Sequence, residues 1–215
     1  MDVKPRVDAA DVLKRVACRL FAERGVDGVT VREIADAAGQ KNHGAVGYHF
    51  GSKEALVREL LIDGAIIIDK KRHERVSALE ARGGPFTVRE LVDIVTETSV
   101  DVMGYPVSEE TYVRFVTMLH LTHQALFYDT IGGRYDQGYK RCVAHLRRLM
   151  PEMPLAAKNQ RILFLGSSLR SILAMREGAL SDISRAHPMW GSNTSLQHLS
   201  QLLTAMLEAP YYALD

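Results

Sequence analysis

Side chains that can contact nucleic acid crowd one short stretch of this chain. Between Ala37 and Lys53 there is no aspartate or glutamate, and the polar residues there can donate hydrogen bonds to bases or phosphates: Gln40, Lys41, Asn42, His43, Tyr48, His49 and Lys53. Phosphate contacts fix the register of a protein on DNA, and contacts to base edges read its sequence. We expect residues 40–45 to read bases and Tyr48 and Lys53 to bind phosphates. Small residues would let the backbone approach a duplex closely: Gly44, Ala45 and Gly47.

Two short helices joined by a tight turn must position these side chains. Apolar residues with helical spacing form one face over residues 31–38. Thr30 is the expected N-cap of this helix, with Glu33 completing a capping box, and Gly39 is suited to end it. A second helix is expected over about 42–49, and Ser52 is the expected N-cap of the next. The arrangement is typical of a helix-turn-helix, whose second helix lies in the major groove of DNA.

Three blocks of sequence, in this order, closely resemble the tetracycline-repressor (TetR) family of bacterial regulators. They are Phe-Ala-Glu-Arg-Gly-Val-Asp-Gly-Val-Thr-Val-Arg-Glu-Ile-Ala (21–35), Ala-Ala-Gly (37–39) and Tyr-His-Phe-Gly-Ser-Lys-Glu-Ala-Leu (48–56), within the first quarter of the chain. The resemblance implies an all-helical homodimer with a three-helix DNA-binding head and a larger body that binds a small molecule. By position, it puts Thr30 and Arg32 at the DNA backbone and assigns phosphate contacts to Tyr48, His49 and Lys53.

The block around the turn departs from the family pattern in two places. The turn after Gly39 is one residue longer than in the commonest members, and Gly47 replaces a bulky side chain. Both differences lie next to the residues expected to read bases. They bear on which bases are contacted and leave the expected fold unchanged.

Composition sets bounds on the class of protein. The 215 residues are 47% hydrophobic and 25% charged, as in an ordinary globular protein, and the net charge is only +1. Residues 1–54 hold nine Lys/Arg against eight Asp/Glu, so specific contacts must carry more of any DNA binding than bulk charge. Acidic residues interrupt the first fourteen positions, which argues against a signal peptide, and the aliphatic run 65–68 is too short to span a bilayer. We expect a cytoplasmic protein whose Cys18 and Cys142 are buried thiols.

The remaining periodicity is helical throughout, which predicts an all-α fold. The domains expected are a helix-turn-helix domain at 1–53 and an effector-binding and dimerisation domain at 54–215. Nine helices are expected: about 9–24, 31–38, 42–49, 52–80, 87–103, 109–128, 134–149, 155–177 and 194–207.

Apolar and aromatic residues in the middle of the chain are candidates for an effector pocket, because such pockets are largely apolar with a few polar groups. The resemblance implies the pocket, and the residues indicate a small, largely apolar effector. For any one residue, ordinary core packing is the competing interpretation. The candidates are Met103, Phe115, Met118, Leu119, His120, His123, Phe127, Tyr128, Met175 and Trp190.

Two late helices carry apolar stripes that fit a dimer interface. Two DNA-reading heads must be held about 34–36 Å apart to reach successive major grooves, which requires a two-fold pairing surface. The resemblance implies that these helices form a four-helix bundle with their mates; the alternative is that the stripes face the core of one chain. The candidates are Ile162, Leu165, Gly166, Leu169, Ile172, Leu173, Leu196, Leu199, Leu203 and Met206.

The function expected is that of a ligand-responsive transcriptional regulator, most simply a repressor that binds a palindromic operator as a dimer and is released by its effector. An all-helical metal-binding protein or enzyme using His120 and His123 is the alternative, since both imidazoles would share one helical face. No Cys pair or carboxylate lies at a matching spacing, and no nucleophile has a base beside it, so we expect no metal, no cofactor and no catalysis. A DNA-binding protein without an effector is a third possibility.

Overall fold

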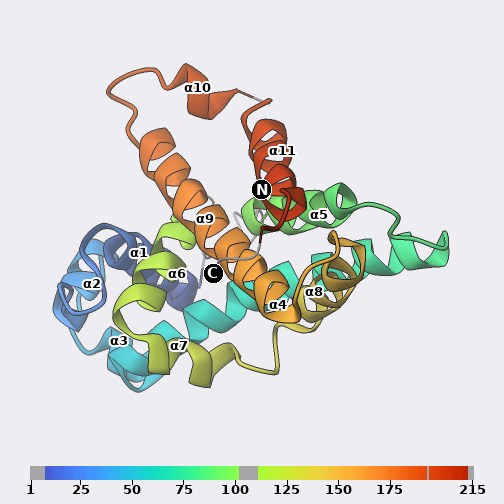
Figure 1. The fold of residues 1–215 in the computed structure, drawn as a ribbon. Helices are drawn as coiled ribbons and strands as arrows, with labels where there is room; N and C mark the ends of the chain where they lie inside the picture. The colour runs from blue at the N-terminus through green and yellow to red at the C-terminus, as the bar shows by residue number, and fades with distance from the viewer. Residues whose placement is uncertain (1–7, 102–110, 193, 213–215) are drawn as a thin grey trace, which may run out of the picture. The chain divides into compact units, whose positions relative to one another are not determined.

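The computed structural model describes residues 8–101, 111–192 and 194–212, and in these ranges the chain is helical without a strand (Figure 1). This confirms the all-α prediction. No helix among these residues is both long and apolar enough to cross a membrane. The helices are α1 Ala9–Arg24, α2 Val31–Ala37, α3 Ala45–Phe50, α4 Lys53–Ala81, α5 Val88–Val100, α6 Tyr112–Thr122, α7 Gln124–Ile131, α8 Gln137–Leu149, α9 Leu155–Ser181, α10 Pro188–Gly191 and α11 Thr194–Glu208.

Several expected helices are wrong in their bounds: α8 begins at Gln137 rather than 134, α9 ends at Ser181 rather than 177, and two further differences have a clear cause. The helix expected from residue 42 begins only at Ala45, because the side chain of Asn42 accepts a hydrogen bond from the Gly44 backbone N–H at 2.8 Å and holds a turn there. The helix expected over 109–128 is interrupted at His123, whose backbone leaves the helical conformation (φ −135°, ψ 54°), so that α6 and α7 are separate. The short α10 was not expected.

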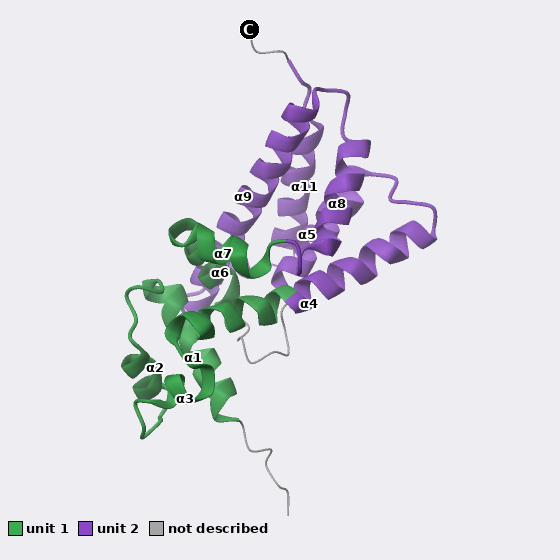
Figure 2. Cartoon of the chain, turned by 90° about the horizontal axis from the view of Figure 1, so that it is seen from below, with its two compact units in different colours: residues 1–65, 102–132 green, residues 66–101, 133–215 purple. Residues whose placement is uncertain are grey.

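The described chain forms two compact units, which Figure 2 distinguishes by colour. Unit 1 is Met1–Ala65 with Val102–Gly132, and unit 2 is Ile66–Asp101 with Gly133–Asp215. Helix α4 contributes its first part to unit 1 and its remainder to unit 2. The three N-terminal helices therefore share a compact unit with α6 and α7. The compact units divide the chain at residues other than 53. They are units of packing and do not test the functional domain boundary expected at residue 53, which stays a prediction.

The core of unit 1 joins α1 to α6. The rings of Phe21 and Phe115 are stacked with centroids 6.0 Å apart, and both side chains are fully buried. Tyr112 at the start of α6 lies over Gly64 of α4 and donates a hydrogen bond to the Leu61 carbonyl at 3.0 Å. A Cβ at Gly64 would lie 2.1 Å from this ring, so the glycine makes the close approach possible.

A buried lysine links α1 to α4 within unit 1. The Lys14 ammonium lies 2.7 Å from Asp63 and 2.5 Å from Glu59. Lys14 is 8% exposed and Asp63 is 9% exposed, so this pair is largely removed from water. Burial by itself would lower the pKa of Lys14, but hydrogen bonds to the two carboxylates outweigh it and raise the pKa above its usual value. The ammonium therefore stays charged inside the unit.

In unit 2, α8 and α5 pack on the second part of α4, and α11 packs between α5 and α9. The Gly138 backbone N–H donates to the Asp69 carboxylate at 2.7 Å. At the other end of the unit, the Arg161 guanidinium of α9 donates to the carbonyls of Leu207 at 2.9 Å and Pro210 at 3.1 Å, and also to that of Ala209. This side chain satisfies carbonyls that the end of α11 leaves without helical partners.

Candidate nucleic-acid interface

A capping box begins α2, as the sequence predicted. The Thr30 hydroxyl accepts from the Glu33 backbone N–H at 3.2 Å, and the Glu33 carboxylate accepts from the Thr30 backbone N–H at 2.8 Å. Arg24 lies 2.8 Å from the same carboxylate. Hydrogen bonds from the backbone and side chain of Thr30, and then from Arg24, lower the pKa of Glu33 from 4.5 to about 2. The start of α2 is thus fixed by a charged group.

We expect the Glu33 carboxyl to remain ionised at pH 3.5 in the folded protein. Because the pKa in the fold is lowered from 4.5 to about 2, its contribution to stability is complete above pH 4.5 and is lost as the pH falls toward 2. The ¹³C shift of the side-chain carboxyl, followed by NMR, measures this directly. In Thr30→Ala the midpoint should move back toward 4.5. A wild-type midpoint near 4.5 would show that the capping box is not formed in solution.

The turn between α2 and α3 is held by three local interactions. Gly39 adopts a left-handed conformation (φ +67°), and the Gln40 backbone N–H reaches back to the Ala35 carbonyl at 2.9 Å. Asn42 caps the turn as described above. His43 is tied to α2 through its Nδ1, which lies 3.0 Å from a carboxylate oxygen of Asp36. The longer turn is therefore ordered by its own side chains.

Helix α3 turns one face inward and leaves the other in solvent. Val46 is fully buried and Ala45 is 6% exposed, whereas Gly47, Tyr48 and His49 are exposed. Tyr48 is 85% exposed, and a Cβ at Gly47 would meet no atom within 4 Å. The Ala45 side chain packs into the core of unit 1, and its expected place at the DNA surface stays a prediction.

Of the remaining residues expected to contact DNA, most are exposed, and one makes contacts that hold the fold together. Arg32, Lys41 and His43 are exposed, and Gln40 is half-buried. Lys53 has a structural role that the sequence did not predict: its ammonium donates to the carbonyls of Val26 and Val29, both at 3.0 Å. It thereby fixes the start of α4 to the loop between α1 and α2, and its contact with phosphate stays a prediction.

The residues expected to line an effector pocket are divided between the two compact units. Phe115 and Leu119 are fully buried in the core of unit 1, so packing accounts for them. Met118, His120, His123, Phe127 and Tyr128 also belong to unit 1, whereas Met175 and Trp190 belong to unit 2, and Met103 lies outside the described residues. The His120 ring meets Phe127 edge-on at 4.7 Å, and its Nε2 lies 3.0 Å from the Tyr128 hydroxyl. The pocket stays a prediction.

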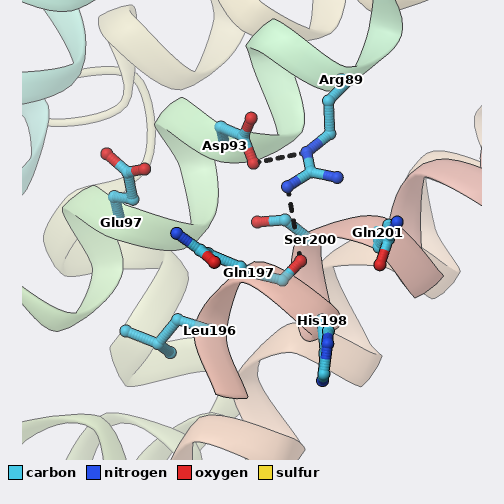
Figure 3. A pocket seen from close by; sticks show the side chains of 8 residues that line it. All are labelled: Arg89, Asp93, Glu97, Leu196, Gln197, His198, Ser200 and Gln201. Atoms are coloured by element: carbon cyan, nitrogen blue, oxygen red, sulfur yellow. Dashed lines mark hydrogen bonds and ion pairs between the residues drawn. The ribbon is translucent and has the colours of Figure 1, made fainter. Parts of the chain in front are cut away.

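A hollow of about 340 Å³ lies between α5 and α11 in unit 2 (Figure 3). It contains none of the residues expected for an effector site, and it is polar. Across it, the Arg89 guanidinium lies 2.7 Å from the Asp93 carboxylate and 3.4 Å from the Gln197 carbonyl (Figure 3). Its walls are formed by Arg89, Asp93, Glu97, Leu196, Gln197, His198, Ser200 and Gln201. Such a lining does not match a largely apolar effector.

Most residues of the stripes expected to form a dimer interface are buried inside unit 2, and the interface itself stays a prediction. Six of the ten residues are buried within their own unit: Ile162, Leu165, Leu169, Leu173, Leu199 and Leu203. The others, Gly166, Ile172, Leu196 and Met206, are half-buried. A different face of α9 is exposed: Leu163, Phe164, Ser167, Ser171 and Met175. Helical spacing alone could not distinguish the two faces, because both carry apolar residues.

The pair His120 and His123 does not converge on one point. His123 Nε2 lies 3.3 Å from the Asp27 carboxylate, while His120 faces the aromatic rings of α7. Among the described residues, no group of three or more His, Cys, Asp or Glu is arranged to hold a metal ion. The two histidines thus join α6 to different neighbours.

A capped first helix, an ordered turn and a short helix with an exposed polar face define a helix-turn-helix DNA-binding protein. Residues 14–60 match the family model described as bacterial regulatory proteins, tetR family. The repressor Rv3405c of Mycobacterium tuberculosis is 32% identical over 147 residues, covering 65% of this chain and 69% of that protein. This chain belongs to the TetR family of transcriptional regulators, which are not enzymes.

The fold is also similar to those of solved regulators. PfmR of Thermus thermophilus aligns with a TM-score of 0.58 at 17% identity, covering 91% of this chain and 96% of that chain. AibR, solved with isovaleryl coenzyme A and operator DNA, aligns with a TM-score of 0.50 at 16% identity, covering 95% and 100%. Matches to curated relatives span between 22% and 69% of those proteins' lengths.

Proposed function

We propose that this regulator is a repressor that binds a palindromic operator as a homodimer, acts in the cytoplasm and is released by a small effector. The observation that carries the proposal is the exposed polar surface of the turn and α3, together with membership of a family of DNA-binding regulators. Selection from random duplex DNA, with sequencing of the bound pool, tests it. A palindrome with half-sites about one helical turn apart is expected. Absence of any enriched motif would contradict it.

Tyr48→Phe should weaken binding to every DNA sequence by about tenfold, since it removes one hydrogen bond to a charged phosphate. The Tyr48 side chain is 85% exposed, so the fold should be unaffected. Lys41→Ala should instead relax preference at particular bases. Fluorescence anisotropy with the selected duplex and its single-base variants separates the two effects. Equal losses on all duplexes for both variants would refute this division of roles.

The exposed face of α9 is the proposed pairing surface. It combines Leu163 and Phe164 with small residues that allow close helix packing, and a second copy of the chain is the occupant that the family suggests. This face differs from the apolar stripe that the sequence pattern predicted for the dimer interface. The proposal therefore makes a different set of α9 residues responsible for dimerisation.

Phe164→Arg should therefore convert the dimer to a monomer or weaken it roughly 30-fold, the effect of losing a central aromatic anchor. Sedimentation velocity over a concentration series measures the association. Phe86→Arg is the matched control, because Phe86 is also an exposed aromatic of unit 2, at 65% against 53% for Phe164. A Phe164→Arg protein that remains dimeric would place the interface elsewhere.

The effector is proposed to act through α6 and α7. These helices share unit 1 with the DNA-reading helices. Two residues, one in α6 and one directly after it, contact the loop between α1 and α2. The Met118 methyl lies beside Gly25, and His123 pairs with Asp27 at 3.3 Å. A ligand that displaces α6 would thus shift the start of α2. Its coupling to DNA binding would be about 1–3 kcal/mol, typical of such linkage.

A further inference from the structure

We infer that Asp36 fixes the tautomer of His43 and thereby makes His43 a reader of the amino-bearing bases, adenine or cytosine. The inference rests on the proposed function, in which the turn before α3 enters the major groove. Nδ1 of His43 lies 3.0 Å from Oδ1 of Asp36. A carboxylate can only accept a hydrogen bond, so in the neutral imidazole the proton is on Nδ1. Nε2 then presents a lone pair.

The geometry leaves this lone pair available to a ligand. The side chains of His43 and Asp36 are each 52% exposed. Within the described ranges, Nε2 of His43 has no hydrogen-bond partner. Arg32 lies on the other side of the same carboxylate, at 3.9 Å from its Oδ2. Asp36 therefore holds the ring by one nitrogen, and the other belongs to a half-exposed side chain on the surface proposed to meet DNA.

The chemistry of the major groove converts this tautomer into a base preference. Adenine N6 and cytosine N4 donate hydrogen bonds there, whereas guanine presents the acceptors N7 and O6 and thymine presents O4. An Nε2 lone pair can accept from an amino group but is repelled by guanine N7. Without Asp36, either nitrogen could carry the proton, and Nε2–H would donate to guanine. Asp36 thus acts on base selection indirectly: it positions the proton of His43, and His43 contacts the base.

The tautomer of His43 can be measured in the free protein, in the absence of DNA. At pH 8, ¹⁵N NMR of labelled histidine should show the neutral His43 ring with its proton on Nδ1. In Asp36→Ala the resonances should move toward the Nε2–H form. Asp27→Ala is the matched control, because Asp27 also pairs with a histidine, His123, in the same compact unit. An Nε2–H tautomer in the wild type would overturn the inference.

Selection from random duplexes at pH 8 then tests the readout. The wild type should enrich adenine or cytosine over guanine by about tenfold at one position of each half-site. His43→Ala should lose this preference, and Asp36→Ala should admit guanine. Unchanged motifs in His43→Ala or Asp36→Ala would overturn the inference alone. If the wild type enriches no motif at all, both the proposed function and the role of His43 as a base reader are overturned. The NMR result would then still decide the tautomer of His43.

Discussion

Replacing Lys14 by methionine is expected to lower the free energy of unfolding of unit 1 by about 3–5 kcal/mol. The substitution keeps most of the side-chain volume but leaves the Asp63 carboxylate, at 9% exposure, without the ammonium that lies 2.7 Å away. A buried carboxylate without a partner costs far more than an exposed one. Urea unfolding followed by far-ultraviolet circular dichroism measures the change, and a loss below about 1 kcal/mol would contradict it.

The double variant Lys14→Met/Asp63→Leu separates the cost of an unpaired charge from the loss of packing. Replacing both members of a buried ion pair by apolar residues is often neutral or stabilising. Glu59, whose side chain is 46% exposed, can remain solvated when Lys14 is absent. We therefore expect the double variant to recover most of the stability that Lys14→Met loses. If it is as unstable as the single variant, the role of Lys14 is packing rather than charge.

Gly138→Ala is expected to destabilise unit 2 by about 3 kcal/mol or to prevent α8 from docking on α4. A Cβ at this position would lie 2.7 Å from Arg72 Cβ and 2.9 Å from both the Asp69 carbonyl oxygen and the His73 backbone nitrogen. Backbone atoms of a helix cannot move aside as the end of a side chain can. Separation of the helices would also lengthen the 2.7 Å hydrogen bond between the Gly138 N–H and Asp69.

Gly166→Ala in α9 is the matched control for Gly138→Ala. Outside the backbone of its own helix, its Cβ would meet the end of the Arg170 side chain at 3.4 Å and the Tyr139 hydroxyl at 3.6 Å, both ordinary contact distances. In the middle of a helix, replacing glycine by alanine is favourable by about 0.5–1 kcal/mol. Thermal unfolding of both variants and the wild type should therefore give opposite shifts. A Gly138→Ala protein as stable as the wild type would show that the two helices are not so closely packed in solution.

The sequence predicted the parts of this protein that depend on local chemistry. The bounds of α1, the capping box of Thr30 and Glu33, the left-handed Gly39 and the long α4 all follow from side chains acting within a few residues of one another. The family followed from the same region, because a helix-turn-helix is encoded by closely spaced caps, glycines and apolar positions. Most of the exposed polar residues of the turn and α3 could be named for this reason.

The tertiary structure decided what periodicity leaves open. Helix α9 has apolar residues on two faces, and only packing determined that Leu165 is buried while Phe164 is exposed. Lys53 was assigned to phosphate, but it bonds carbonyls 24 and 27 residues earlier in the chain, and Lys14 meets Asp63 across 49 residues. Such partners are brought together by folding alone. Local sequence determines which elements form, and burial and long-range pairing determine which of their side chains remain available for function.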